Sequence, residues 1–191
     1  MSPNSGFLTL GELERLGIEC GRDVQVDSTV LLFGAEYIRL GSHVRIDAGV
    51  QITAAAPVTI GDHVHIGAAS HLFGGAGIEI CDFAGLSSRV SLFSMSDDYS
   101  LGYLTNPTVP AKYRLVTGGK IVLGRHAIVG CGTVILPGVH VGEGAAIGAL
   151  SLVNKNVPPF EIFHGNPARR IGTRDEQRLR SLEASLLEEE L

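Results

Sequence analysis

Aliphatic residues recur at every sixth position over much of this chain, and that period constrains the fold more than any other feature. Steps of six from Leu123 reach Val129, Ile135, Val141, Ile147 and Val153. Four residues after each of these, the chain carries only small or β-branched residues. An α-helix repeats near 3.6 residues and a half-buried strand at 2, so neither explains the pattern.

The N-terminal half shows the same period, interrupted by a regular shift of two residues. Three six-residue units plus two extra residues make a larger unit of twenty, and Val24, Val44, Val64 and Ala84 lie twenty apart. We interpret each larger unit as one triangular turn of a solenoid with three short, flat strands. Successive turns stack by parallel backbone hydrogen bonding, and such stacks need capped ends.

The predicted caps divide the chain into three segments. Residues 1–17 form an N-terminal capping helix segment, in which Thr9 and Glu12 have the spacing of a capping box. Residues 18–172 form the solenoid. Residues 173–191 form a C-terminal helix with a second expected capping box at Thr173 and Glu176. Its leucine stripe predicts packing on the end of the coil or on a neighbouring subunit.

Composition restricts the class of protein. The chain has 191 residues, 45% of them hydrophobic, which is enough for one large core, and its net charge of −5 argues against nucleic-acid binding. Three cysteines without a CxxC spacing predict free thiols in a reducing compartment. We find no apolar run long enough for a membrane span and no features of a signal peptide, so we expect a cytoplasmic protein.

One long segment, loop 95–120, abandons the period. It begins with "SMSDDYS" and holds three of the four tyrosines of the chain. A flat solenoid lacks a pocket, and long irregular loops in compact domains are usually functional or disordered. We expect this loop to cover an acceptor site on its own or the next subunit; the alternative is that it only buttresses an oligomer.

The units "IVGCGT VILPGV HVGEGA AIGALS LVNKNV" and the tail "HGNPARRIG" resemble those of the hexapeptide-repeat acyltransferases. The resemblance covers about Cys20 to Ile171. It implies an all-β fold, a left-handed parallel β-helix with short terminal helices. It also implies a homotrimer and an acetyl-CoA donor bound between subunits. The left hand comes only from this resemblance, because parallel crossovers are in general right-handed.

Within that family, "SMSDDYS" and "TNPTVP" resemble segments of enzymes that acylate amino sugars during the assembly of surface polysaccharides. The resemblance points most of all to amino sugars that are linked to a nucleotide. The resemblance implies an acetyl-CoA-dependent N-acetyltransferase that works by direct attack on the thioester. The galactoside and maltose type carries a histidine where Asp97 stands. A carboxylate is a weak base for a hydroxyl but suits an amine. Asp97 is therefore the first candidate for the acceptor-site base, or for an anchor of the amine.

Other acceptor-site candidates come from the same resemblance. Asp98 is expected to assist Asp97, and Tyr99 of the same loop to contact the substrate. Both aspartates could instead cap the loop turn. His65 matches an aromatic position at the acceptor and is the second candidate base. His71 precedes "LFGGAG", where glycines replace an acidic pair and predict a roomier acceptor pocket.

The donor candidates lie in the last coils. The resemblance implies that backbone amides near Cys131 and Ala149 hold the pantetheine arm and the thioester oxygen. It implies that Asn154 and Lys155 meet the nucleotide end of coenzyme A and that Arg169 pairs with its 3′-phosphate. The alternative for Arg169 is a solvated tail.

The residues alone leave other functions open. The runner-up is a sugar O-acetyltransferase of the galactoside and maltose type. A non-catalytic trimeric scaffold and a γ-type carbonic anhydrase are further alternatives. The anhydrase would need zinc, for which His65 and His71 are the only candidate pair; we predict no metal site. The sugar, its ring position, the nucleotide carrier and the acyl chain length also stay open.

Overall fold

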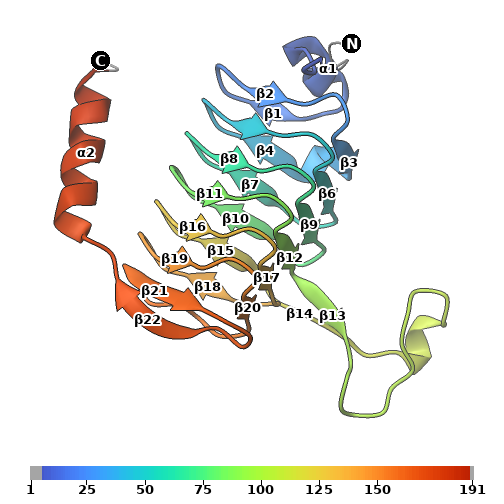
Figure 1. The fold of residues 1–191 in the computed structure, drawn as a ribbon. Coiled ribbons are helices and arrows are strands. Elements are labelled where there is room, and N and C mark those ends of the chain that lie inside the picture. The colour runs from blue at the N-terminus through green and yellow to red at the C-terminus, as the bar shows by residue number, and fades with distance from the viewer. Residues whose placement is uncertain (1–5, 190–191) are drawn as a thin grey trace, which may run out of the picture.

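A computed structural model describes residues 6–189, and these form a left-handed parallel β-helix of about seven turns (Figure 1). The predicted fold is confirmed. Three parallel sheets, here called sheets 1, 2 and 3, make the three sides of the triangular coil.

Sheet 1 consists of β1 (Glu19–Cys20), β4 (Ile38–Leu40), β7 (Val58–Ile60), β10 (Ile78–Ile80), β15 (Ile121–Leu123) and β18 (His140–Val141). Sheet 2 consists of β2 (Gln25–Val26), β5 (Arg45–Ile46), β8 (His65–Ile66), β11 (Gly85–Leu86), β16 (Ile128–Val129), β19 (Ala146–Ile147), β21 (Glu161–His164) and β22 (Arg169–Thr173). Sheet 3 consists of β3 (Leu31–Phe33), β6 (Gln51–Ala54), β9 (His71–Gly74), β12 (Ser91–Phe93), β17 (Val134–Ile135) and β20 (Leu152–Val153).

The strand register follows the sequence period. In sheet 1, Leu40 pairs with Ile60, Ile60 with Ile80, and Ile80 with Leu123. Leu123 then pairs with Val141, so the later coils are two residues shorter than the earlier ones. The aliphatic residues of these ladders are buried in one continuous core. Each coil therefore buries its apolar side chains on those of the next.

One corner of the coil carries a stack of rings. His43, His63, Phe83 and His126 all have φ between 56° and 59°, and successive ring centroids lie 4.6, 4.7 and 5.0 Å apart. The left-handed corner turns each ring onto the next, and the stack is half-buried.

Both ends of the stack are covered. Helix α1 (Leu10–Arg15) begins with the predicted capping box, since Thr9 and Glu12 bond reciprocally, and its Leu13 is buried against the first coil. A short 3-10 helix, η1 (Ala35–Tyr37), follows the first coil. At the other end the antiparallel pair of β21 and β22 closes the solenoid. No helix within residues 6–189 is long and apolar enough to cross a membrane.

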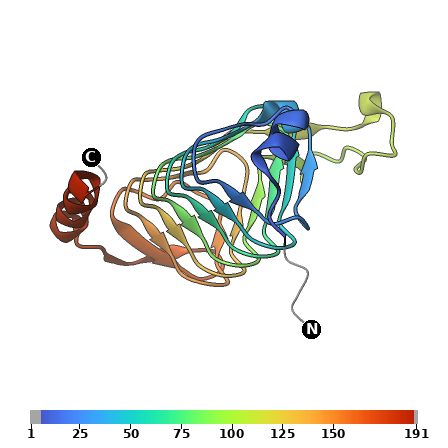
Figure 2. The ribbon, with the colours of Figure 1, turned by 90° about the horizontal axis from the view of Figure 1, so that it is seen from above.

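Helix α2 (Glu176–Glu189) does not pack on the end of the stack, which was the first of its two expected positions. It runs alongside the coils rather than on the end of the stack (Figures 1 and 2). The expected capping box at Thr173 is wrong, because Thr173 ends β22 and Asp175 accepts the bond from the Arg178 amide at 2.9 Å. The predicted end segments also include residues 1–5 and 190–191, which lie outside the described residues.

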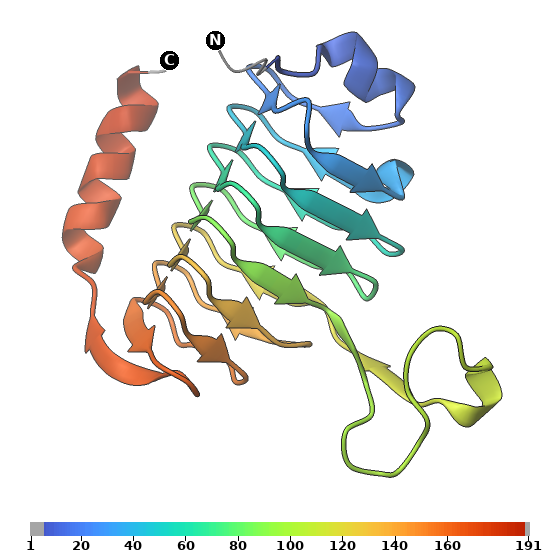
Figure 3. The same cartoon turned by 45° about the vertical axis from the view of Figure 1, so that its right-hand side comes forward.

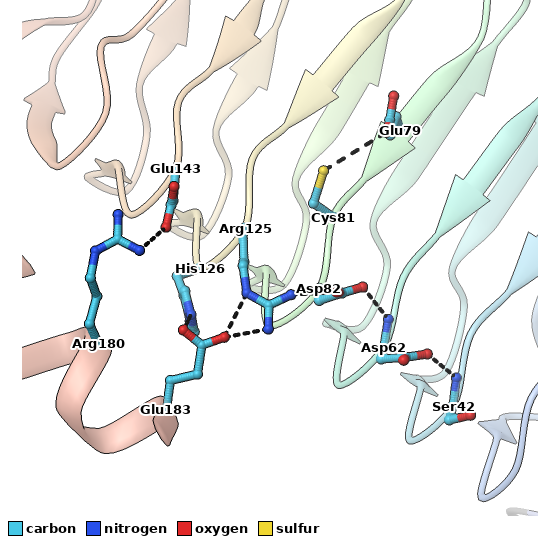
Figure 4. Close-up of polar contacts among 10 residues, drawn as sticks. All are labelled: Ser42, Asp62, Glu79, Cys81, Asp82, Arg125, His126, Glu143, Arg180 and Glu183. Carbon is cyan, nitrogen blue, oxygen red and sulfur yellow. Dashed lines mark hydrogen bonds and ion pairs between the residues drawn. The ribbon is translucent and has the colours of Figure 1, made fainter. Parts of the chain in front are cut away.

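Polar contacts fasten α2 to one corner of the coil (Figure 4). The Glu183 carboxylate contacts the Arg125 guanidinium and lies 2.9 Å from the imidazole Nε2 of His126. Arg125 also pairs with Asp82. The side chains of His126 and Glu183 are only 11% and 13% exposed. Water therefore screens this cluster little, and charge pairing gives it more strength than an exposed ion pair would have.

The irregular segment forms an arm. Strands β13 (Met95–Asp97) and β14 (Val116–Gly118) pair antiparallel, and the chain between them includes the 3-10 helix η2 (Ala111–Tyr113). The arm projects from the side of the stack, away from α2 (Figures 1 and 3). It places several large apolar side chains in solvent in the single chain.

The substitution Glu183→Gln tests the attachment of α2. Burial raises the pKa of Glu183, but bonds and charge from His126 and Arg125 outweigh burial and lower it from 4.5. A carboxyl whose pKa is lowered by folding stabilises the fold above its ordinary pKa, and this is lost as pH falls through the folded value. At pH 7 the free energy of opening α2, measured by amide hydrogen exchange, should drop by about 2 kcal/mol.

The difference from the unsubstituted protein should shrink as pH falls below 4.5 and through the lowered pKa of Glu183. Glu188→Gln is the matched control, since Glu188 lies on the same helix, is exposed and forms no ion pair within residues 6–189. An equal effect of the two substitutions would contradict a specific attachment through Glu183.

Candidate active site

A cleft of about 380 Å³ at the C-terminal end of the solenoid brings together three predicted donor residues. Asn154 and Lys155 lie in the turn after β20, and Arg169 begins β22. The Arg169 guanidinium donates to the neighbouring Ala168 carbonyl at 2.9 Å. Among the described residues no carboxylate pairs with Lys155 or Arg169. Two exposed cations thus remain available to an anionic ligand.

Cys131 and Ala149 occupy equivalent corners of successive coils, between sheets 2 and 3. The Leu150 amide donates to the Cys131 carbonyl at 2.8 Å, which joins the two coils there. The amides of Cys131 and Ala149 themselves have no acceptor within residues 6–189. A side chain on Gly130 would lie 2.5 Å from the Ala149 nitrogen. Glycine therefore lets the coils pack closely and keeps the backbone of this corner accessible.

A second hollow continues the same corner toward the N-terminus. Ser88 is the equivalent of Cys131 one coil earlier, and it lines a cavity of about 260 Å³. We call this the β11 chamber; it is lined by His65, Gly67, Gly85, Leu86, Ser87, Ser88 and Ile128. Three coil spacings, roughly 14 Å, separate it from the coil that precedes Arg169. The corner and the chamber therefore lie on one edge of the solenoid, between sheets 2 and 3, whereas the cleft extends at the C-terminal end from Arg169 to the turn after β20.

His65 is held in the chamber by an acidic neighbour. Its Nε2 lies 2.8 Å from the Asp47 carboxylate, which also accepts from the Arg45 guanidinium at 2.7 Å. Burial raises the pKa of Asp47, but these bonds to Arg45 and His65 outweigh burial and lower it. Asp47 is thus a carboxylate near neutral pH, and it fixes the orientation of a half-exposed imidazole.

His71 occupies a different surface. It lies on sheet 3, on the next face of the same coil, with its ring centroid 5.9 Å from that of Phe73. The glycines after it were expected to widen an acceptor pocket. Within the chain, Gly75 makes room for the base of the arm, because a Cβ there would lie 2.4 Å from the sulfur of Met95.

The three predicted loop residues all belong to the arm. Asp98 accepts hydrogen bonds from the amides of Ser100, Leu101 and Tyr103, and the bonds from Ser100 and Leu101 are the main reason why its pKa is lowered. Asp98 therefore caps the turn, as the alternative interpretation had it. It also remains a candidate substrate contact.

Within the described part of the chain, Asp97 accepts only from the Asn106 amide, at 3.2 Å, so much of its carboxylate is available to a ligand. Tyr99 is 94% exposed. Asp97 has no contact with His65, which lies on sheet 2, so one chain does not bring the two candidate bases together.

Sequence reasoning missed the chamber residues Gly85, Ser87, Ser88 and Ile128. Gly85 faces outward between His65 and Ile128 on the adjacent strands of sheet 2. A glycine at an outward position of a regular strand was visible in the repeat, and it was the one available signal. Within residues 6–189 we find no group of three or more histidine, cysteine or acidic side chains placed to hold a metal ion.

The substitution Asp98→Ala should release the loop that Asp98 organises. Three backbone amides lose their acceptor, so residues 98–105 should be cleaved at least tenfold faster in limited proteolysis. Asp97→Asn is the control, because its amide oxygen can still accept from Asn106. Equal cleavage of the two variants would show that Asp98 does not hold the loop.

Comparison with known proteins supports one class of enzyme. A variant of AntD, an N-acyltransferase from Bacillus cereus, with dTDP and coenzyme A is 35% identical, with a TM-score of 0.92 over 96% of this chain and 99% of that one. AntD with dTDP and 3-hydroxybutyryl-CoA is 36% identical, with a TM-score of 0.91 over 96% of this chain and 97% of that one.

Among curated proteins, dTDP-4-amino-4,6-dideoxy-D-glucose acyltransferase from Escherichia coli is 43% identical over 97 residues. The match covers 51% of this chain and about half the length of that relative. No family model matches the chain. The protein belongs to the hexapeptide-repeat acyltransferases, and within them to the N-acyltransferase family that includes AntD.

Proposed function

We propose that the protein is an acyl-CoA-dependent N-acyltransferase that acts on a dTDP-linked amino sugar. The observation that carries the proposal is the run of corner and chamber along one edge of the solenoid, with the cleft at its C-terminal end. Two cations stand at one end of it and a carboxylate-held imidazole at the other. AntD, solved with dTDP-4-amino-4,6-dideoxyglucose and coenzyme A, supports the choice of both substrates.

The donor occupies the cleft and the corner. Arg169 pairs with the 3′-phosphate of coenzyme A, and Asn154 and Lys155 meet its nucleotide end, because cations there compensate phosphate charge. The pantetheine arm then follows the corner past Ala149 and Cys131. An amide there that lacks an acceptor stabilises the oxyanion that forms on the thioester carbonyl.

The reaction is a direct transfer without an acyl-enzyme. The sugar amine, once neutral, attacks the thioester carbonyl and forms a tetrahedral intermediate. A carbon–nitrogen bond forms and the carbon–sulfur bond breaks, so that the thiolate of coenzyme A leaves. The nitrogen loses one proton to a base, and the thiolate finally takes up a proton, so the charges balance.

Asp97 is the proposed base, since much of its carboxylate is available at the start of the arm. Asp98 orders that part of the arm and assists at the substrate. Tyr99 and His71 are proposed acceptor contacts. His65 is the second candidate base, because Asp47 orients its imidazole at the chamber.

The site is completed by a homotrimer in this proposal. The arm projects from its own solenoid with Tyr99, Leu101 and Leu104 exposed, and a neighbouring subunit would cover them and receive Asp97 at its chamber (Figure 3). Three free cysteines fit a cytoplasmic enzyme. Its product would serve the assembly of surface polysaccharides.

The first test measures release of free thiol from acetyl-CoA with dTDP- and UDP-linked amino sugars, each paired with its hydroxyl counterpart. Release with an amino sugar alone is the expected result. Release with the hydroxyl sugar would favour the O-acetyltransferase alternative. No release although coenzyme A binds would sink the nucleotide-sugar assignment, and no binding of coenzyme A would sink the acyltransferase.

The substitution Asp97→Asn should lower kcat about 10²- to 10⁴-fold with little change in the affinity for coenzyme A, because it removes a base but keeps the shape. The same assay on His65→Ala compares the two candidate bases. If Asp97→Asn retains full activity and His65→Ala does not, His65 is the base.

The substitution Arg169→Ala should weaken coenzyme A binding about tenfold, since an exposed cation loses its phosphate. Binding of dephospho-coenzyme A, which lacks the 3′-phosphate, should hardly change. Arg170→Ala is the matched control, because Arg170 pairs with Glu161 and does not line the cleft. Calorimetric titration measures the affinity for both ligands. An equal loss of affinity for both would show that Arg169 does not pair with the 3′-phosphate.

A further inference from the structure

We propose that Arg89 is a further catalytic residue of the transfer and that its guanidinium stabilises the negative charge that forms on the thioester. The inference rests on the proposed function, which brings the thioester to the corner near Cys131. Three observations carry it. Arg89 stands at that corner, its charge has no partner in the described part of the chain, and the fold does not require an arginine at its position.

The Arg89 side chain lies beside the backbone that is proposed to hold the thioester. Its guanidinium Nη2 is 4.0 Å from the sulfur of Cys131, so the side chain reaches from its own coil to the next one. The amide of Cys131 has no acceptor within residues 6–189. A carbonyl oxygen that accepts a hydrogen bond from this amide would therefore lie close to a positive charge.

The charge of Arg89 is not neutralised by its own chain. Arg89 is exposed, and the weak contact with the Cys131 sulfur is its one side-chain hydrogen bond among the described residues. Arg45 and Arg125, in contrast, each pair with an aspartate. A guanidinium without a carboxylate partner keeps its donors for an anion that arrives with a ligand.

Packing does not explain an arginine at this corner. The register of sheet 3 makes Ala69, Gly132 and Leu150 the equivalents of Arg89 in other coils. All four residues have φ between 55° and 69°. The same left-handed backbone thus carries a small, an absent, an apolar or a charged side chain, and the cation stands only in the coil that precedes Cys131.

The position of Arg89 selects the reacting end of the donor. The phosphates of coenzyme A are proposed to lie with Arg169 and Lys155, and three coil spacings, roughly 14 Å, separate the coil of Arg89 from the coil before Arg169. Between these two ends Leu150 is apolar and 77% exposed, and its side chain covers Gly132. The guanidinium of Arg89 therefore faces the thioester rather than the phosphates.

The transfer develops negative charge at this place twice. When the amine attacks, the carbonyl oxygen of the thioester becomes an oxyanion. When the carbon–sulfur bond breaks, its electron pair leaves with the sulfur as a thiolate. A cation held nearby stabilises both species more than the neutral thioester, and this lowers the barrier. The proton of the amine still goes to the base, and Arg89 stays charged throughout because a guanidinium does not lose its proton in proteins.

The first test separates the charge of Arg89 from its shape. Arg89→Ala copies Ala69 at the equivalent corner, and Arg89→Gln keeps a hydrogen-bonding side chain without the charge, so both variants should fold. We would measure the kinetics with acetyl-CoA and the amino sugar that the thiol-release assay identifies. Both variants should lower kcat at least about tenfold and change either KM less than about twofold. Arg89→Lys, which keeps the charge, should recover most of kcat.

Arg178→Ala is the matched control, because Arg178 is exposed and also forms no ion pair within residues 6–189, but lies on α2. It should leave kcat unchanged. A raised KM for the sugar with an unchanged kcat in Arg89→Ala would make Arg89 an acceptor contact and overturn the inference. So would a weaker affinity for coenzyme A with an unchanged kcat, since Arg89 would then act on the phosphates.

The second test removes the sugar from the reaction. Hydroxylamine, a small neutral nucleophile, attacks the thioester carbonyl of acetyl-CoA; a carbon–nitrogen bond forms, the carbon–sulfur bond breaks, and a hydroxamic acid and coenzyme A result. The protein should accelerate this reaction, and Arg89→Ala should lose most of the acceleration because the charge acts on the thioester itself. No acceleration by the unsubstituted protein, or the same acceleration by Arg89→Ala, would overturn the inference.

The results also distinguish this inference from the function on which it rests. If the amino sugar is acylated and Arg89→Ala retains its kcat, only the role of Arg89 is refuted. If the unsubstituted protein neither binds coenzyme A nor acylates any amino sugar, the proposed function is refuted and the role of Arg89 with it.

Discussion

The structure depends on one repeated interaction, the stacking of an inward aliphatic side chain on its equivalent in the next coil. Ile60, Ile80 and Leu123 illustrate it, since all three are buried and each is in register with the next. A shift by one residue would move every such side chain to the surface, so the register is strongly specified. A regular stack in turn gives straight corners, and a straight corner can hold an extended ligand.

The corners of the coil carry the ring stack, the ion pairs and the accessible backbone amides of the molecule. At one of them, left-handed residues stack their rings, and Arg125 and His126 attach α2 through Glu183. At another, Gly130 leaves the backbone accessible, because a side chain there would collide with the backbone of Ala149 in the next coil. The same geometry thus fastens a helix on one edge and offers backbone amides on another.

The features that distinguish this solenoid lie where the chain departs from its repeat. The arm interrupts the repeat between β12 and β15 and carries Asp97 away from its own coil. Gly85 interrupts the outward row of sheet 2 and leaves a chamber. A solenoid that kept its period throughout would have neither, and this explains why the candidate acceptor residues fall at irregular positions.

The sequence by itself determined the coil and its register, because a six-residue period fixes which side chains point inward and which corners repeat. It also located the arm and the Thr9 capping box. Only the tertiary structure decided where α2 lies, since the contacts of Glu183 join residues far apart in the chain. The same holds for the orientation of His65 by Asp47, and for Met95 filling the space beside Gly75. Local periodicity specifies stacking, but contacts between a regular body and its irregular additions depend on three-dimensional packing.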